Sequence, residues 1–142
     1  MPIFYDISPE LNLLVYIGKE KITVKDYYRA VDEAALDPRR TQGMFTIIDL
    51  LFASVDMGLE DMQYIINRIN ARAQKGLPPE PTAILTMDSG MYIAGETINL
   101  LPSEAPLQLD VFYSIDTAIS ALGLSDHNQE VMLFWEQARL RA

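Results

Sequence analysis

One predicted helix start carries residues that could bind an anion. Ser89 and Gly90 follow Asp88 where an apolar strand pattern gives way to a helical one. Free backbone N–H groups at a helix start can hold a phosphate or carboxylate, and glycine lets the backbone approach closely. The simpler interpretation, which we prefer, is that Ser89 caps the helix beside its acidic neighbour. Ser89 and Gly90 are therefore a candidate anion or ligand site.

Asp49 is the best candidate for acid–base chemistry. It stands near the end of the apolar run 44–51, and strand ends in parallel sheets often line ligand sites. The alternative, which we prefer, is that its carboxylate caps a neighbouring helix or loop. Asp49 thus joins Ser89 and Gly90 as a candidate ligand residue, and no catalytic residue is assigned.

Few residue types suited to nucleophilic or metal chemistry are present. The chain has no cysteine and a single histidine, His127, in a polar setting. It has no Gly-x-Ser-x-Gly elbow and no glycine-rich phosphate loop. The adjacent acids Asp32-Glu33 and Glu60-Asp61 point about 100° apart on a helix, so neither pair holds one cation well. We expect no metal and no cofactor.

Net charge and hydropathy limit the kinds of partner that we expect this protein to bind. The net charge is −9, so nucleic acid and anionic membrane surfaces are poor partners. Arg39–Arg40 and the set Arg68, Arg72 and Lys75 could form a local anion-binding patch, although solvated surface charges are the preferred interpretation. No apolar run approaches the roughly 20 residues of a membrane span, and no signal peptide begins the chain. These patterns predict a cytoplasmic protein.

Strand and helix signals alternate along the chain. Apolar runs predict strands at 3–7, 11–17, 44–51, 82–87 and 107–113, with a polar turn at 18–21. Helical patterns begin at Thr23, Asp56, Ser89, Ser114 and either Ser125 or Asp126, and the second and fourth end at Gly76 and Gly123. Such alternation implies a mostly parallel sheet. No linker divides residues 1–142, so we expect one domain.

Four short segments, in order, carry a family resemblance. They are Leu14 to Gly18, Ile47 to Leu50 with its aspartate, Asp56-Met57-Gly58-Leu59, and Phe112 to Gly123. Over about 11–124 they resemble the STAS family of sulfate transporters and anti-sigma-factor antagonists, in particular its divergent bacterial branch. The resemblance implies an α/β fold with a mixed, mostly parallel sheet of four to five strands. Helices pack on this sheet, and a C-terminal helix at about 126–141 is additional.

The resemblance departs from the family at a functional position. Where phosphorylated members have a serine before the glycine, this chain has Met57, between Asp56 and Gly58. Methionine cannot accept a phosphate, and Ser54 does not match the motif position. The segment implies a module that is not switched by phosphorylation at the usual site.

The last predicted helix carries an aromatic stripe. Val131, Phe134, Trp135 and Ala138 recur on one side of it. Such a stripe either docks on the chain's own sheet or forms an interface with a protein partner or a second copy. We prefer docking, and keep the interface as the functional alternative.

Two functions from different classes follow. The resemblance implies a non-catalytic protein-interaction or regulatory module. The alternative is a small-ligand or lipid-binding domain with a pocket between sheet and helices, with or without weak hydrolytic chemistry at Asp49 or Ser89. A cavity lined by methionine, phenylalanine and tyrosine would favour the ligand. A filled core with an exposed aromatic patch would favour the protein partner.

Overall fold

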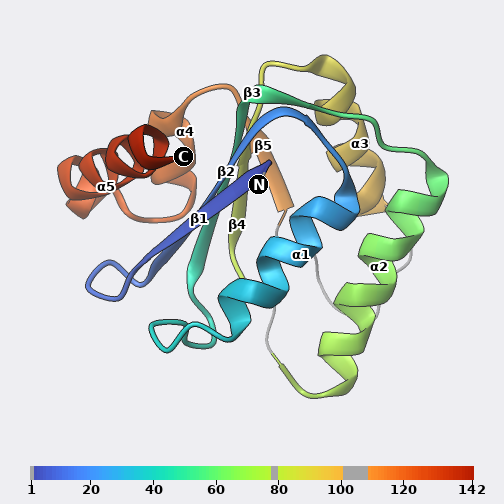
Figure 1. Ribbon diagram of the computed structural model, residues 1–142, viewed down its shortest axis with the longest axis horizontal. Helices are drawn as coiled ribbons and strands as arrows, with labels where there is room; N and C mark the ends of the chain where they lie inside the picture. Colours follow the sequence, from blue (N-terminus) through green and yellow to red (C-terminus); the bar gives the residue numbers. More distant parts are fainter. Residues whose placement is uncertain (1, 78–79, 101–108) are drawn as a thin grey trace.

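The structure is a computed structural model that describes residues 2–77, 80–100 and 109–142. Its centre is a five-stranded sheet in the order β1-β2-β3-β4-β5, in which β1 is antiparallel to β2 and the other pairs are parallel (Figure 1). The strands are β1 (Ile3–Ser8), β2 (Leu13–Ile22), β3 (Phe45–Val55), β4 (Thr82–Leu85) and β5 (Leu109–Phe112). The predicted mixed, mostly parallel α/β fold is confirmed.

Helices cover both faces of the sheet (Figure 1). One face carries α1 (Val24–Ala35), α2 (Leu59–Gln74) and α3 (Ser89–Leu100), and the other carries α4 (Ile115–Ala121) and α5 (Asn128–Arg141). A short 3-10 turn, Ser125–His127, precedes α5. The additional C-terminal helix is therefore present.

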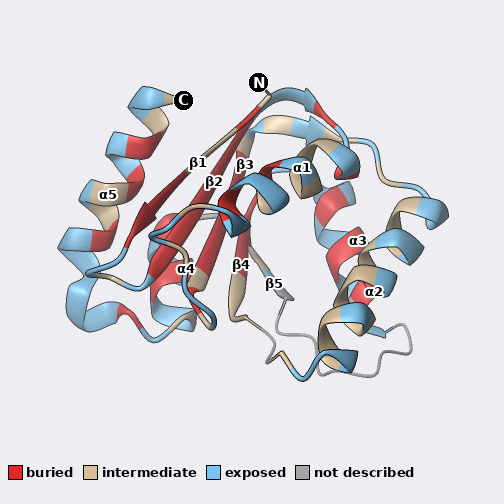
Figure 2. Cartoon of the chain, turned by 60° about the horizontal axis from the view of Figure 1, so that its bottom comes forward, coloured by how far each residue is buried: buried red, intermediate tan, exposed pale blue. Residues whose placement is uncertain are grey.

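The central strands are buried on both faces, which explains their continuous apolar sequences (Figure 2). In β3, Ile47 belongs to the core beneath α4 and α5, whereas Ile48 belongs to the core facing α1. Successive side chains of a strand point to opposite faces, so β3 supplies both cores.

Two strands are longer than their apolar runs predict: β2 continues to Ile22 and β3 continues to Val55. The expected polar turn at 18–21 is wrong: β2 continues to Ile22 and stays paired with β3, through a register shift between Ile17 and Lys19. Beyond the shift, Glu20 has a positive φ of 62° and is paired with Ala53. Lys19, Glu20 and Lys21 are all exposed, so this end of the strand has no apolar pattern that a sequence analysis could detect.

Two predicted helix caps are also corrected. Gly58, not Asp56, is the N-cap of α2, and the Asp61 carboxylate accepts the Gly58 N–H at 3.0 Å. At α3 the Asp88 carboxylate accepts the Gly90 N–H at 2.9 Å, so Asp88 provides the cap expected of Ser89. In both cases a carboxylate reaches a free N–H that the predicted residue does not contact.

Other predicted ends are confirmed. Ser114 caps α4, and Gly76 and Gly123 follow helices with φ of 72° and 74°, a conformation that glycine adopts without a Cβ clash. The end of the third predicted helix, 101–102, and the start of the last predicted strand, 107–108, lie outside the described residues.

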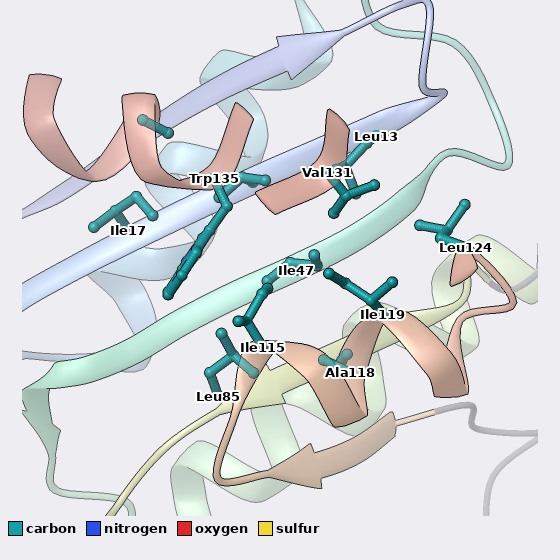
Figure 3. Packing of buried hydrophobic residues seen from close by; sticks show 13 residues of the cluster. Leu13, Ile17, Ile47, Leu85, Ile115, Ala118, Ile119, Leu124, Val131 and Trp135 are labelled. Atoms are coloured by element: carbon teal, nitrogen blue, oxygen red, sulfur yellow. The ribbon is translucent and has the colours of Figure 1, made fainter. Parts of the chain in front are cut away.

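The aromatic stripe of α5 docks on the sheet (Figure 3). Val131, Trp135 and Ala138 are buried against β2 and β3 side chains such as Leu13 and Ile47. Phe134 is half-buried and packs beside them. Docking on the chain's own sheet, the preferred interpretation, is what the structure shows, and three of the four side chains are not available to a partner.

Candidate functional site

A cavity of about 260 Å³ lies between the sheet and helices α1 to α3. Side chains of β2, β3 and β4 form its floor, including Tyr16, Ile48 and Ile84, and the helices form its walls. Native cores are normally close-packed, so a space of this size in the layer where a core belongs is a candidate ligand site.

Loose packing of α2 produces the cavity. The sequence gives this helix a clear apolar face, yet of its 16 residues only Ile66 is buried. Ile65, Ile69 and Ala73 lie on the same face and line the cavity while remaining half-buried. The apolar face predicted for α2 is therefore real, but it borders a space rather than closing onto the sheet.

Three tyrosines lie together in the lining, Tyr16 on the floor and Tyr27 and Tyr28 on the α1 wall. The rings of Tyr16 and Tyr27 meet edge-to-face with centroids 5.2 Å apart, and Tyr27 meets Tyr28 in the same way at 5.0 Å. Burial raises the pKa of Tyr28 to about 12 and places the pKa of Tyr27 well above its ordinary value. The phenols are therefore neutral near pH 7, and the wall is largely apolar with hydroxyl groups attached.

A charged group closes one end of the cavity. Nη2 of Arg40 lies 2.5 and 2.7 Å from the two carboxylate oxygens of Glu80, and Nη2 of Arg72 lies 3.1 Å from one of them. All three side chains line the cavity, and about 16% of the Arg40 side chain and 12% of the Glu80 side chain are exposed. Two guanidinium groups thus share one carboxylate.

The predicted basic patches divide in the structure. Arg40 and Arg72, one from each, meet at Glu80. Arg39 pairs instead with Asp6 and Asp37, and its hydrogen bonds hold the pKa of the Asp37 carboxyl well below its usual range. Arg68 pairs with Asp32 and stacks on Tyr28 at 4.5 Å, and Lys75 is exposed. The tertiary structure therefore selects one arginine from each predicted set.

Asp49 lies on the opposite face from the cavity. Its buried carboxylate accepts the Leu51 N–H at 2.9 Å and the Trp135 indole N–H at 2.8 Å, and Nε of Arg139 lies 3.5 Å away. Asp49 thus anchors α5 to β3. The structure does not bring it together with Ser89 and Gly90, which begin α3 on the other face and are exposed.

The α3 start is poorly suited to an anion, because the negatively charged Asp88 side chain already occupies the Gly90 N–H. The segment Asp56-Met57-Gly58, singled out by the sequence resemblance, lies between β3 and α2. There Met57 lines the cavity and Asp56 is exposed. An apolar side chain thus stands at this part of the cavity wall.

Sequence reasoning missed Glu80, Tyr16, Tyr27 and Tyr28 as cavity residues. The adjacent pair Tyr27 and Tyr28 was the one detectable sign of an unusual site. Neighbours on a helix diverge by about 100°, so both rings cannot enter one ordinary core. Glu80 stands alone in a proline-rich segment, and no local pattern distinguishes it. Within residues 2–77, 80–100 and 109–142, no three histidine, aspartate or glutamate side chains gather as a metal site would require. No helix of that part of the chain has the length and apolarity to cross a membrane.

Comparison with known proteins supports the fold. No family model matches the chain, and no curated protein matches it. A similar solved structure is an uncharacterised protein of the DUF3478 family, with a SpoIIAA-like fold, from Shewanella loihica PV-4. It is 18% identical, the match covers 83% of this chain and 90% of that one, and the TM-score is 0.50. The chain therefore has a SpoIIAA-like fold.

Proposed function

We propose that this protein binds a small, largely apolar molecule in the cavity between its sheet and helices α1 to α3. The single observation that carries the proposal is the cavity of about 260 Å³, lined by aliphatic, methionine and tyrosine side chains. Ligand sites are typically concave and mostly apolar with a few placed polar groups, which describes this space.

The free energy of the folded protein favours a ligand in the cavity. An unfilled apolar space forfeits the dispersion contacts that its walls would otherwise make, and so lowers the free energy of unfolding. A ligand that fills the space restores those contacts.

The proposed role is binding without catalysis. Asp49, the acid–base candidate, is buried and engaged with Trp135 on the other face of the sheet. Met57 gives the phosphorylation-site segment an apolar side chain at the cavity wall, and we propose that no phospho-switch operates there. A protein-interaction role, implied by the resemblance, stays a prediction, and any interface must use residues other than the buried part of the α5 stripe.

Two matched substitutions on α2 test the ligand proposal. Ala73 lines the cavity, whereas Ala71 is exposed on the same helix and does not. The wild-type protein is titrated with the neutral fluorescent dye Nile red and with 1-decanol as a competitor. We expect saturable binding that Ala73→Phe weakens at least tenfold, because the ring occupies the space, and that Ala71→Phe leaves unchanged.

Two results would contradict the ligand proposal. Absence of saturable dye binding by the folded wild-type protein contradicts the proposal. Equal effects of the two phenylalanines would place the dye elsewhere on the surface and contradict it as well. Circular dichroism spectra of both variants establish that they are folded.

A further inference from the structure

Strand β5 forms one edge of the sheet. It pairs with β4 on one side, and no strand of the described residues pairs with it on the other (Figure 2). The Phe112 carbonyl oxygen accepts the Thr86 N–H at 2.9 Å, so Phe112 directs its backbone groups towards β4. Because alternate residues of a parallel strand bond the same neighbour, Val111 directs its N–H and C=O groups to the outer side. Such an edge is able to pair with a further strand.

A groove of about 350 Å³ lies at this edge. Its lining comes from β5 and from the helices on either face of the sheet: Asp110, Val111 and Phe112 from β5, Tyr92, Gly95 and Glu96 from α3, and Ala121 from α4. The small residues Gly95 and Ala121 stand on its two sides. They leave room beside the strand for an extended chain.

The charge around the groove is negative. Residues 76–138 contain nine acids and no lysine or arginine, so this stretch by itself accounts for the net charge of −9. Strand β5 and both helices that flank it belong to the stretch. The charged residues of the groove, Glu96 and Asp110, are both exposed, and neither forms an ion pair with another described residue. A basic partner therefore fits this edge.

Two tyrosines stand beside these carboxylates. The ring of Tyr92 lines the groove and stacks on the ring of Tyr113, which directly follows β5, with centroids 6.0 Å apart and planes 9° apart. The Tyr113 side chain is 54% exposed. An aromatic face next to a carboxylate attracts a lysine or arginine side chain through cation–π interaction as well as through charge.

We propose that an extended, lysine- or arginine-rich segment of a partner protein binds at this edge and adds a strand to β5. Its backbone pairs with the outward groups of Val111, while its basic side chains contact Glu96 and Asp110 and the stacked tyrosines. Strand addition takes its affinity from main-chain hydrogen bonds and its specificity from the side chains that flank them. The groove lies at the edge of the sheet, so this binding does not depend on a ligand in the cavity.

A second copy of this chain is a poor occupant, because pairing two β5 edges would bring their acidic residues together. A simpler role for Asp110 is to guard the edge, since charged side chains on edge strands oppose unwanted pairing. The two roles differ in what a basic peptide does. A guarded edge leaves it unbound, whereas a docking site binds it through its backbone as well as its charge.

Three eight-residue peptides separate backbone pairing from charge. The first alternates lysine and valine, and the second alternates glutamate and valine. The third has the lysine–valine sequence with every peptide nitrogen methylated, so it keeps the charge but has no backbone donor. Fluorescence anisotropy of the labelled peptides with the wild-type protein at pH 7.5 measures binding. We expect the first peptide to bind at least tenfold tighter than either of the others.

Amide hydrogen exchange locates the contact. The Val111 N–H points away from β4, so a bound strand should pair with it and slow its exchange at least tenfold. The methylated peptide at the same concentration is the control. An unchanged exchange rate at Val111 with the lysine–valine peptide bound contradicts strand addition.

Matched variants assign the binding to residues. Asp110→Asn and Glu96→Gln should each weaken binding of the lysine–valine peptide several-fold, because each removes a charge that faces its basic side chains. Asp126→Asn and Glu130→Gln are the controls and should change it little, because these two acids are exposed, belong to the same acidic stretch and do not line the groove. Circular dichroism spectra establish that all four variants are folded.

Three further results overturn strand addition. The first is an absence of saturable binding of the lysine–valine peptide, and self-association of Asp110→Asn would then identify the guard role. The second is equal binding of the methylated peptide, which would show that charge alone acts. The third is an equal effect of the groove variants and their controls, which would place the peptide elsewhere on the acidic surface. Nile red binding is measured separately, so the ligand proposal stands or fails independently.

Discussion

At the residue scale, Asp49 illustrates how a suggestive carboxylate becomes structural. Its position at the end of a buried strand is typical of ligand sites, but its partners come from its own chain. One oxygen accepts the Leu51 N–H and the other accepts the Trp135 indole N–H, with Arg139 close by. Arg139 in turn lies over the rings of Phe52 and Trp135, at 4.6 and 4.7 Å. The group therefore holds a helix in place and has no vacant side for a substrate.

Asp49→Asn is predicted to destabilise the fold without affecting the cavity. The amide removes the negative charge beside Arg139 and cannot accept hydrogen bonds through both of its terminal atoms. We expect a loss of about 1–3 kcal/mol in the free energy of unfolding, the range for leaving buried polar groups poorly satisfied. Urea denaturation measures it. Asp56→Asn, an exposed acid in the β3–α2 loop, should change stability by less than about 0.5 kcal/mol.

Nile red affinity supplies the second readout for Asp49→Asn. Asp49 and the cavity lie on opposite faces of the sheet, so we expect the affinity of the folded variant to be unchanged. A large change in affinity, or wild-type stability of the variant, would contradict the structural role assigned to this carboxylate.

At the element scale, α2 and α5 show two outcomes of the same kind of sequence pattern. Both have apolar residues on one side. On α5 they are Val131, Trp135 and Ala138, which are buried in the sheet-facing core, whereas α2 buries only Ile66. Helix periodicity predicts which side of a helix is apolar, but it does not predict how closely that side packs against the sheet. The distance between helix and sheet decides whether the layer between them is filled or contains a cavity.

The contact between α3 and β5 is close enough to test. A Cβ added at Gly95 would lie 2.7 Å from Cγ2 of Val111. Alanine gains up to about 1 kcal/mol of helix propensity over glycine, but overpacking against a rigid β-branched side chain costs about 1–3 kcal/mol. We therefore expect Gly95→Ala to lower the free energy of unfolding.

A double-mutant cycle isolates the cause. In a Val111→Ala background the clashing methyl group is absent, so Gly95→Ala should become neutral or stabilising. Thermal or urea unfolding of the four proteins measures the coupling between the two positions. Equal costs of Gly95→Ala in both backgrounds would show that the close approach is not the reason for a glycine at this position.

At the scale of the whole molecule, one sheet joins a filled face and a face with a cavity. Strands β2 and β3 place alternate side chains in the two cores, so neither core can form without the other. The SpoIIAA-like fold supplies this architecture, but a fold does not by itself define a function. The function proposed for this chain comes from the cavity.

Shared strands predict that the molecule unfolds in one step. Trp135 is the single tryptophan and reports the α5 face, while far-ultraviolet circular dichroism reports the whole backbone. The two signals should give the same urea midpoint. Decanol at about 100 times its dissociation constant should stabilise the protein by about 2.7 kcal/mol and shift both midpoints together, although it binds on the other face. Separate midpoints would show that the two faces unfold independently.

The sequence alone determined the fold class and most of its elements. Alternating strand and helix patterns predicted a mostly parallel sheet, and the glycines after α2 and α4 marked their ends, because these signals depend on neighbouring residues. The same reasoning failed at residues 18–21, where pairing with β3 keeps polar residues in a strand. It also missed both acidic caps, since each depends on where a single carboxylate points.

Only the tertiary structure decided the site. Arg40, Arg72 and Glu80 come from three segments, and Asp49 and Trp135 are 86 positions apart, so no local pattern links them. The cavity depends on the distance between α2 and the sheet, which is set by how all the surrounding side chains pack. Residue types and periodicity specify what each surface offers, whereas the three-dimensional arrangement specifies which surfaces meet and which leave room for a ligand.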